Sequence, residues 1–585
     1  MNRKELLFLL AVVVFVLPAG LQRLAAEEKS AADLFPASTI AYLEMTDPNA
    51  AVEVILKHPL RAKIEALDDI QKQMKSDEYQ QFLMIVTAIE RQIGMSWRKA
   101  INTVTHDGLY IGVDAKTEGL AILLKSNDEE KLSQLYDKFI ELARAESERK
   151  GNGDRIESKD YRGIKAHKVD KGILAQTGRW LLMSNKGDLA KAIADAVLDG
   201  QEASLASNDN FKSARDSMSG SPTAWGYLNV SALRDAGMLK DLVKEKNDNP
   251  GIEFLAGGII GSLANTPYLT FTLDFNSNHI KLAASMPHDR SSVPKRREFF
   301  FGADGEGVAP TPLLPKQTLL SIESFRDIGK FWLAKEELFV ENVVAQMAQA
   351  DSQFSTFFSG LDFGQEVLSA LDPRSQFVLV RQSYEEADLP EPDIKLPAGA
   401  YIYRLKDPDA ISQRLKVGFQ SIFGLANLGL AQQGQPQFDV NTEKVGDARI
   451  ISASYIVDDV KEGLINYNFS PTIVFVDNWL ILSSTKSLAH ELAKLATDRK
   501  DDERKTETNT RSAIDFRVLE EVLADNEEQL VARNVLEKGH SKADAEKEIG
   551  TLLNLLKSSK DLSLQLLNSG DALTLQWKLR FAEQE

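Results

Sequence analysis

The chain has 585 residues, is 43% hydrophobic and carries a formal charge of −17 at pH 7, with no cysteine. This hydrophobic share is sufficient to build real cores, while the lack of cysteine excludes disulfides and lipid attachment through a thiol. The negative charge repels phosphate backbones and anionic membrane surfaces. We therefore expect no nucleic-acid partner.

The first 26 residues have the features of a secretory signal peptide. Arg3 and Lys4 give a positive start, an unbroken apolar run follows from Leu6 to Leu17, and small residues at Ala25 and Ala26 offer a cleavage site. The apolar run is too short for a spanning helix, and we find no second stretch that is long enough. We expect an exported protein, periplasmic or extracellular, which stays tethered if the signal is not cleaved.

The sequence from about residue 36 onward contains the same ordered set of patterns twice. Pro36 to Glu44 and Pro315 to Glu323 share the spacing P-x-x-T-φ-x-x-φ-E, where φ is apolar. A gapless match aligns the stretch from Trp180 to Ala194 with that from Trp479 to Ala493. The order of the patterns is kept throughout, which predicts an internal duplication.

Each copy is predicted to begin with a strand, 39–45 or 318–324, followed by a long helical region. Two further strands, a helix that starts at 129 or 408, and a hairpin with its turn at 177–178 or 477–478 come next. A strand leads into a capped helix at Asn229 and at Asp515, and a hairpin closes each copy. Copy one has 13 extra residues in its first helical region, and copy two has 20 extra residues around 424–441, where we expect a loop.

Hairpins interspersed with helices predict antiparallel pairing and an α+β fold with helices on one face of the sheet. The predicted domains are a signal peptide at 1–26, a first copy at 27–286, a linker at 287–314 and a second copy at 315–585. Gly302, Gly305 and Gly307 in the linker superficially suggest a phosphate loop, but no strand precedes them and two prolines follow.

The ionisable residues give no catalytic, cofactor or metal site. The seven histidines lack the spacing of zinc ligands on one helix face, and common hydrolase and nucleotide-binding motifs are missing. His106 and Asp107 form a dipeptide that we interpret as solvated turn residues rather than a catalytic pair. We therefore assign no catalytic, cofactor-binding or metal-binding residue.

Two repeated pairs have a functional and a structural interpretation. Glu44 and Glu323 each end a first strand, and together they would offer acid/base chemistry or a cation site; we favour solvated strand ends. Trp180 and Trp479 would stack on a sugar ring; we favour hairpin anchors that pack against the core.

Two apolar segments are candidates for binding. Gly257, Gly258 and Gly261 would bring a helix close to a neighbour or to a lipid-like ligand, and we expect a buried, tightly packed helix. The region from Val417 to Leu430 is rich in Phe, Leu and Ile. If that region is exposed, it marks a surface for a partner or a ligand.

The repeated anchors, together with the signal segment, resemble a family of large exported bacterial proteins that carry a domain of unknown function. The resemblance rests on Pro36 to Glu44, Leu228 to Val230, Trp180 to Ala194 and their partners in copy two. It implies an exported location and a shared architecture, and it brings no catalytic or binding residue.

We predict a cell-envelope protein of unknown activity that binds or scaffolds without enzymatic turnover. Its expected partners are an envelope protein or an apolar small molecule. Two alternatives stay open, a carrier of an apolar ligand, which needs an apolar cavity, and an envelope hydrolase, which needs a concave cluster of ionisable side chains.

Overall fold

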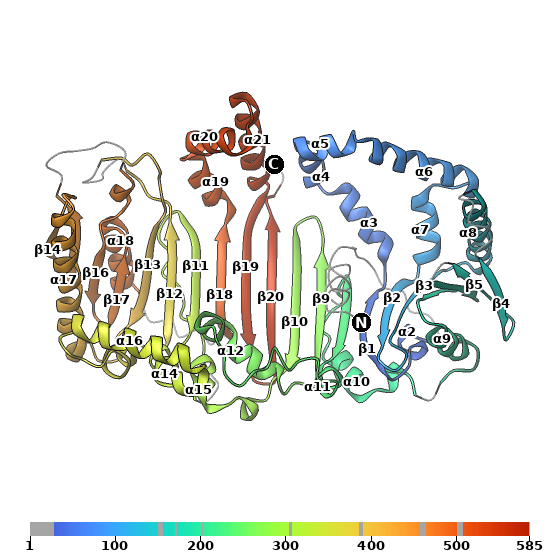
Figure 1. The fold of residues 1–585 in the computed structure, drawn as a ribbon, viewed down its shortest axis with the longest axis horizontal. Coiled ribbons are helices and arrows are strands. Elements are labelled where there is room, and N and C mark those ends of the chain that lie inside the picture. The colour runs from blue at the N-terminus through green and yellow to red at the C-terminus, as the bar shows by residue number, and fades with distance from the viewer. Residues whose placement is uncertain are drawn as a thin grey trace. The chain divides into compact units, whose positions relative to one another are not determined.

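The computed structural model describes residues 29–149, 156–169, 172–201, 203–303, 307–384, 390–456, 464–499 and 507–583 (Figure 1). The predicted signal peptide lies outside these residues, so its cleavage stays a prediction. Within the described ranges, no helix has both the length and the apolar character needed to cross a bilayer.

The chain divides into two compact units. Unit 1 comprises the described residues up to Met238 together with Thr266–Pro287, and unit 2 comprises Leu239–Asn265 and the chain from His288 onward. Unit 2 therefore includes a segment that interrupts unit 1 in the sequence.

Unit 1 contains a ten-stranded sheet within the described residues, and every pairing in it is antiparallel. The strands lie in the order β4-β5-β6-β7-β3-β2-β1-β8-β9-β10. Their bounds are β1 (Thr39–Met45), β2 (Gly108–Asp114), β3 (Gly119–Lys125), β4 (Glu157–Tyr161), β5 (Ile164–Val169), β6 (Gly172–Thr177), β7 (Trp180–Ser184), β8 (Ala224–Asn229), β9 (Tyr268–Phe275) and β10 (His279–Pro287).

The helices of unit 1 fall into two groups. One group packs against the sheet and builds the main core, in which α2, α9 and α10 cover Tyr42, Leu123, Leu182 and Trp225. The other group, α3 to α7, extends beyond the strand ends, and α7 returns to β2 (Figure 1). The bounds are α2 (Ala31–Leu34), α3 (Pro48–Lys57), α4 (Leu60–Glu65), α5 (Asp68–Met74), α6 (Asp77–Ile93), α7 (Trp97–Thr105), α8 (Glu129–Arg149), α9 (Gly187–Asp199), η1 (Leu205–Ser207), α10 (Asp209–Asp216) and α11 (Val230–Asp235).

The sheet of unit 2 has the same strand order as that of unit 1. Its order is β14-β15-β16-β17-β13-β12-β11-β18-β19-β20, again antiparallel throughout. The bounds are β11 (Thr318–Phe325), β12 (Arg374–Val380), β13 (Ala398–Arg404), β14 (Phe438–Val445), β15 (Ala448–Tyr455), β16 (Thr472–Val476), β17 (Trp479–Ser483), β18 (Thr508–Asp515), β19 (Ser559–Asn568) and β20 (Ala572–Phe581). Each strand of unit 2 thus takes the place of the unit 1 strand whose number is lower by ten.

Helices cover both faces of the unit 2 sheet. Alternate residues of β15, β16 and β17 point to opposite sides, so Ile450 and Ile481 pack against α18, while Ile451 and Leu480 pack against the side that carries α17. The bounds are α12 (Pro250–Leu263), η2 (Arg290–Ser292), η3 (Lys295–Arg297), α13 (Glu298–Phe301), α14 (Ile328–Leu333), α15 (Lys335–Leu338), α16 (Glu341–Phe357), η4 (Phe363–Val367), η5 (Leu368–Ala370), α17 (Pro408–Gln432), η6 (Ile465–Asn468), α18 (Lys486–Thr497), α19 (Phe516–Ala524), α20 (Glu527–Lys538) and α21 (Lys542–Leu556).

The predicted α+β class with antiparallel pairing is confirmed, since both sheets are antiparallel and helices pack on them. The expectation that helices lie on one sheet face is wrong for unit 2. The apolar runs of β16 and β17 have buried residues at consecutive positions, and both faces of such strands need a cover.

Several predicted turns and caps are present. Gly178 and Asp477 occupy the hairpin turns with φ of 53° and 49°, a conformation that Gly and Asp tolerate better than most residues. Asn229 Oδ1 accepts a hydrogen bond from Ala232 N at 3.0 Å, and Asp515 Oδ1 accepts one from Val518 N at 3.1 Å. The shared polar residue at this strand end is therefore a helix cap, as predicted.

The insertion of copy two lengthens regular elements instead of forming a long loop. Helix α17 continues to Gln432, and β14 begins at Phe438, so only five residues separate them. Asn427 holds the junction, because its side chain donates to Phe438 O at 2.8 Å and accepts from Phe438 N at 2.7 Å. Within the region 424–441 where we predicted a loop, residues 433–437 form it and include most of the glutamine-rich stretch, while the flanking residues belong to α17 and β14.

The predicted boundary at 287–314 and the observed division of the chain differ. Helix α12 precedes that boundary but belongs to unit 2. Residues 298–301, in the predicted linker, form α13, and Phe299, Phe300 and Phe301 are all buried. This stretch contributes core side chains to unit 2.

Candidate interaction surfaces and polar sites

Glu44 is buried in unit 1 and fully paired. Arg215 contacts both of its carboxylate oxygens, with Nη2 donating to Oε2 at 2.6 Å, and Tyr42 OH donates to Oε2 at 3.1 Å. The guanidinium of Arg215 also lies over the ring of Trp225, 4.6 Å from its centroid. A carboxylate held this way stabilises the strand end and has few acceptor positions left for chemistry.

Glu323 has the same strand position in unit 2 but different partners. It is buried, accepts a hydrogen bond from Ser321 Oγ, and lies 4.0 Å from Nε of Arg511. Burial is the main cause that raises the pKa of Glu323, and the hydrogen bond and the arginine oppose that shift. The interpretation of Glu44 and Glu323 as solvated strand ends is therefore wrong, because both side chains are buried.

Trp180 and Trp479 serve as hairpin anchors, as predicted. Both are buried in the main cores of their units. A cation lies over each ring, from Lys125 in unit 1 and from Arg404 in unit 2, at 5.0 and 4.3 Å from the centroids. Each cation belongs to the residue directly opposite the tryptophan in the neighbouring strand. The two units therefore share a cation–π contact at the equivalent tryptophan.

His106 and Asp107 contact each other, and Asp107 also contacts Arg179. His106 follows α7, with its Nδ1 2.7 Å from Oδ1 of Asp107, and Arg179 contacts the other oxygen of Asp107. Asp107 is thus engaged in an ion pair beside an exposed histidine. Among the described residues, no group of three or more His, Asp or Glu side chains is placed to hold a metal ion.

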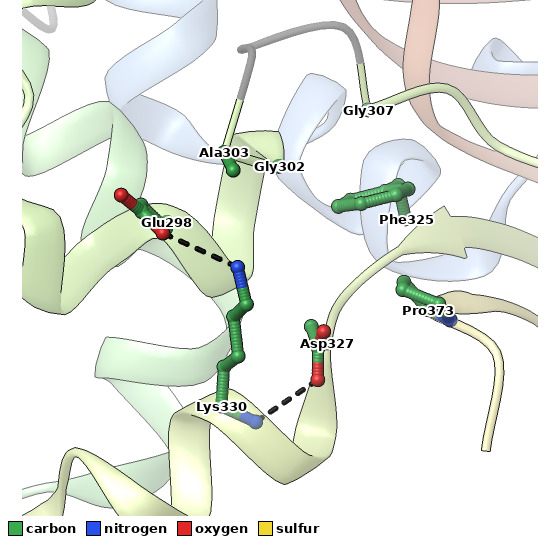
Figure 2. Close-up of a pocket in the computed structure, with 8 residues that line it drawn as sticks. All are labelled: Glu298, Gly302, Ala303, Gly307, Phe325, Asp327, Lys330 and Pro373. Atoms are coloured by element: carbon green, nitrogen blue, oxygen red, sulfur yellow. Dashed lines mark hydrogen bonds and ion pairs between the residues drawn. The ribbon is translucent and has the colours of Figure 1, made fainter. Parts of the chain in front are cut away.

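A pocket of about 370 Å³ in unit 2 is lined by Glu298, Gly302, Ala303, Gly307, Phe325, Asp327, Lys330 and Pro373 (Figure 2). Its charged groups are already paired. Lys330 Nζ lies 3.2 Å from Glu298 Oε2, and Asp327 Oδ1 accepts from the backbone N of Lys330 at 2.9 Å. Gly307 N donates to Phe301 O, so that amide is not available to a phosphate. Gly305 lies outside the described residues.

Helix α12 is tightly packed along its glycine face, as predicted. Gly257, Gly258 and Gly261 are buried, and a Cβ at Gly258 would lie 2.3 Å from Cδ1 of Phe300. Arg297 approaches the same face beside Gly261. The close approach is made to side chains of unit 2, so it gives no sign of a lipid-like ligand.

The apolar region from Val417 to Leu430 lies on α17 and is partly exposed. Ile411, Leu415 and Gly418 form the buried stripe of the first half of the helix. The stripe continues at helical spacing into the second half, where Ile422 and Leu425 are exposed because the core beneath them has ended.

We call the exposed second half of this helix the α17 surface, defined by Ile422, Gly424, Leu425, Leu428 and Gly429. Leu425 and Leu428 are 55% and 62% exposed. No atom lies within 4 Å of a Cβ built on Gly424 or Gly429, so the space over both glycines is open. The chain has no charged residue from Val417 to Phe438.

Helix α6 is a second exposed apolar element, and our sequence analysis did not identify it. No residue of α6 is buried, although several of its residues are large and apolar. Phe82, Met84 and Ile85 are 57%, 65% and 58% exposed. The signal was present in the sequence, because apolar residues recur at 82, 85, 86 and 89 inside the longer first helical region of copy one. That pattern predicts an apolar helix face, which is normally assumed to be covered by core.

No family model matches the chain, and no curated protein matches it. Solved structures of TP0453 show a weak similarity. Crystal form I is 11% identical with a TM-score of 0.24 and covers 45% of this chain and 80% of that chain. Crystal form III is 10% identical with a TM-score of 0.25 and covers 46% of this chain and 83% of that chain.

Proposed function

We propose that this protein is an exported cell-envelope protein that binds or scaffolds a protein partner through the α17 surface. The observation that carries the proposal is the run of uncharged residues on an exposed helix, where Leu425 and Leu428 project beside two open glycines. Exposed apolar residues at helical spacing are typical of surfaces that receive an amphipathic or apolar helix.

The two glycines and the lack of charge around them indicate which kind of partner fits the α17 surface. Because nothing occupies the space over Gly424 and Gly429, a second helix can approach the α17 backbone closely there. The leucines then supply the contact area on either side. An uncharged helix fits this surface best, since burying an unpaired charge against it would be strongly unfavourable.

The export part of the proposal rests on residues 1–26 of the sequence. It is tested by N-terminal sequencing of the protein recovered from its own envelope fraction, where we expect a chain that begins at Glu27. Recovery of full-length chain from the cytoplasm would contradict export.

The binding part is tested by substituting the open glycines. Gly424→Leu and Gly429→Leu place bulk where the partner approaches, and leucine also has a higher helix propensity than glycine. The fold should therefore be retained. Gly550→Leu is the matched control, because Gly550 also lies on a helix of unit 2 with open space over it.

We expect a protein that co-purifies with the wild type from the envelope to be lost from the α17 variants and kept by the Gly550 control. Equal recovery from the wild type, the α17 variants and the control would overturn the proposal. The same preparations, analysed by native mass spectrometry, address the alternatives, since a bound apolar small molecule would favour the carrier.

A further inference from the structure

We propose that α6 is an interfacial helix that inserts its apolar face into a lipid surface. This inference is independent of the α17 surface, because it concerns unit 1 and a different kind of partner. We call Phe82, Ile85 and Ile89 the α6 stripe, since they recur at i, i+3 and i+7 and all three are exposed.

The stripe is held in place without core packing. Ser76 Oγ accepts from Tyr79 N at 3.2 Å at the start of the helix, and Gly94 ends it with φ of 78°. Near the C-terminal end, Lys138 Nζ donates to Ile93 O at 2.8 Å. Polar contacts at both ends therefore fix α6, while its large apolar side chains face outward and do not contribute to a protein core.

The exposure of the whole α6 stripe favours a lipid surface over a groove-type protein contact. The helix contains no buried residue, and α4 before it contains none either. A helix that projects in this way, with apolar residues on one face and Gln, Glu and Arg on the other, matches the pattern of helices that lie in the plane of a membrane interface. Trp97 begins α7 just after it and is also exposed, with the guanidinium of Arg98 5.5 Å from the centroid of its ring. Aromatic residues with a polar edge favour that boundary.

The charge distribution also favours this segment as the part that meets lipid. From Pro48 to Thr105 the sequence has eight Lys or Arg and seven Asp or Glu, a formal charge of +1, whereas the whole chain carries −17. The overall charge led us to expect repulsion from anionic membranes, but this segment does not share the negative charge of the chain. Lys75 and Arg91 flank the stripe in the sequence, and their positive charges would attract anionic lipid headgroups.

The experiment uses the absence of cysteine in the chain. The mature protein with Ile85→Cys carries one thiol, which takes an environment-sensitive fluorophore such as nitrobenzoxadiazole. Thr87→Cys is the control, because Thr87 is exposed on the opposite side of the same helix. Each labelled protein is mixed with vesicles of phosphatidylcholine and phosphatidylglycerol, and emission is recorded together with flotation of the vesicles.

We expect the label at 85 to shift to shorter wavelength and gain intensity with vesicles, and the label at 87 to change little. We further expect Phe82→Gln with Ile85→Gln and Ile89→Gln to lower the vesicle partition coefficient roughly a hundredfold. Leu536→Gln with Leu552→Gln is the control for exposed apolar residues elsewhere, and it should partition as the wild type does.

The proposal is overturned if the wild type does not float with vesicles, or if it floats equally well after the stripe is changed. It is also overturned if the label at 85 responds in the absence of vesicles and sedimentation shows a dimer that the stripe variant lacks, since the stripe would then join two copies of this chain. Because the stripe is exposed, its substitution should leave the melting temperature unchanged, and this is checked on every variant.

Discussion

Replacing Glu253 by alanine tests how α12 is held in unit 2. The carboxylate is 0% exposed and receives two hydrogen bonds from Arg297, which is 6% exposed, at 2.7 Å from Nε and 3.0 Å from Nη2. Glu253→Ala would leave a buried guanidinium without its counter-charge, a change that typically destabilises a protein by about 3–5 kcal/mol.

Neighbouring contacts make the effect local to unit 2. Arg326 Nε donates to Phe254 O at 3.0 Å, and the ring of Phe254 meets that of Phe331 at a centroid distance of 5.0 Å. Loss of the Glu253 pair should therefore loosen α12 together with the strands and helices it covers. Unit 1 has no part in these contacts.

Urea unfolding gives the change in stability, and hydrogen exchange read by mass spectrometry shows where it occurs. We expect faster exchange in peptides from 250–263 and 290–301, with peptides from β1 to β3 unchanged. The double variant Glu253→Leu with Arg297→Leu should recover much of the loss, because an apolar pair of similar volume needs no counter-charge. Asp199→Ala, which breaks the exposed pair with Arg162, is the surface control and should have little effect.

A loss below about 1 kcal/mol for Glu253→Ala, or a loss that the double variant does not reduce, would refute this reasoning. The first result would mean that water reaches Arg297. The second would mean that the packing of α12, and not the ion pair, sets the stability.

Three further predictions concern single residues. Burial raises the pKa of Glu323, so the folded protein holds this proton more tightly, and stability should decrease as pH rises above 4.5 through the raised pKa. Glu323→Gln should flatten this dependence of stability on pH, measured by urea titrations at several pH values. An unchanged dependence would assign the effect to another group. Gly258→Ala should lower the melting temperature by overpacking against Phe300, a cost of about 1–3 kcal/mol, whereas Gly550→Ala should raise it slightly; equal effects would show that Phe300 moves aside. Trp180→Ala should destabilise unit 1 by about 3–5 kcal/mol in calorimetry, and a change under 1 kcal/mol would mean that the hairpin does not depend on this anchor.

The sequence predicted correctly those features that depend on residues close together in the chain. Turn residues such as Gly178 and caps such as Asn229 and Asp515 act over a few positions, and the paired patterns correctly placed the strands that carry Glu44 and Glu323. The repeated order of strands in the two units agrees with the repeated order of these patterns.

Interactions between distant residues could not be predicted in this way. The partner of Glu44 is Arg215, 171 positions away, whereas among the described residues of copy two it is Arg511, on the neighbouring strand, that approaches Glu323. The sequence repeat shows that a carboxylate occurs at the same place in both copies, but it does not show which cation pairs with it. The same limit applies to α12, whose membership of unit 2 depends on Arg297 and Phe300 in a stretch predicted as a linker.

The exposed surfaces were missed or left open for a related reason. Apolar periodicity identifies a helix face but gives no information about whether another element covers it. Helices α6 and α17 carry such faces, and only the structure shows that the core ends before Leu425 and never reaches Phe82.

The most direct test of the proposed function is photo-crosslinking from the α17 surface in the native envelope. A benzophenone amino acid at position 425 is compared with the same group at Gln413, which is exposed on the charged half of the helix. From the proposed function we predict a discrete protein adduct from position 425 that disappears when Gly429→Leu is added, and no matching adduct from position 413. The same adducts from both positions, or an adduct that survives Gly429→Leu, would contradict it.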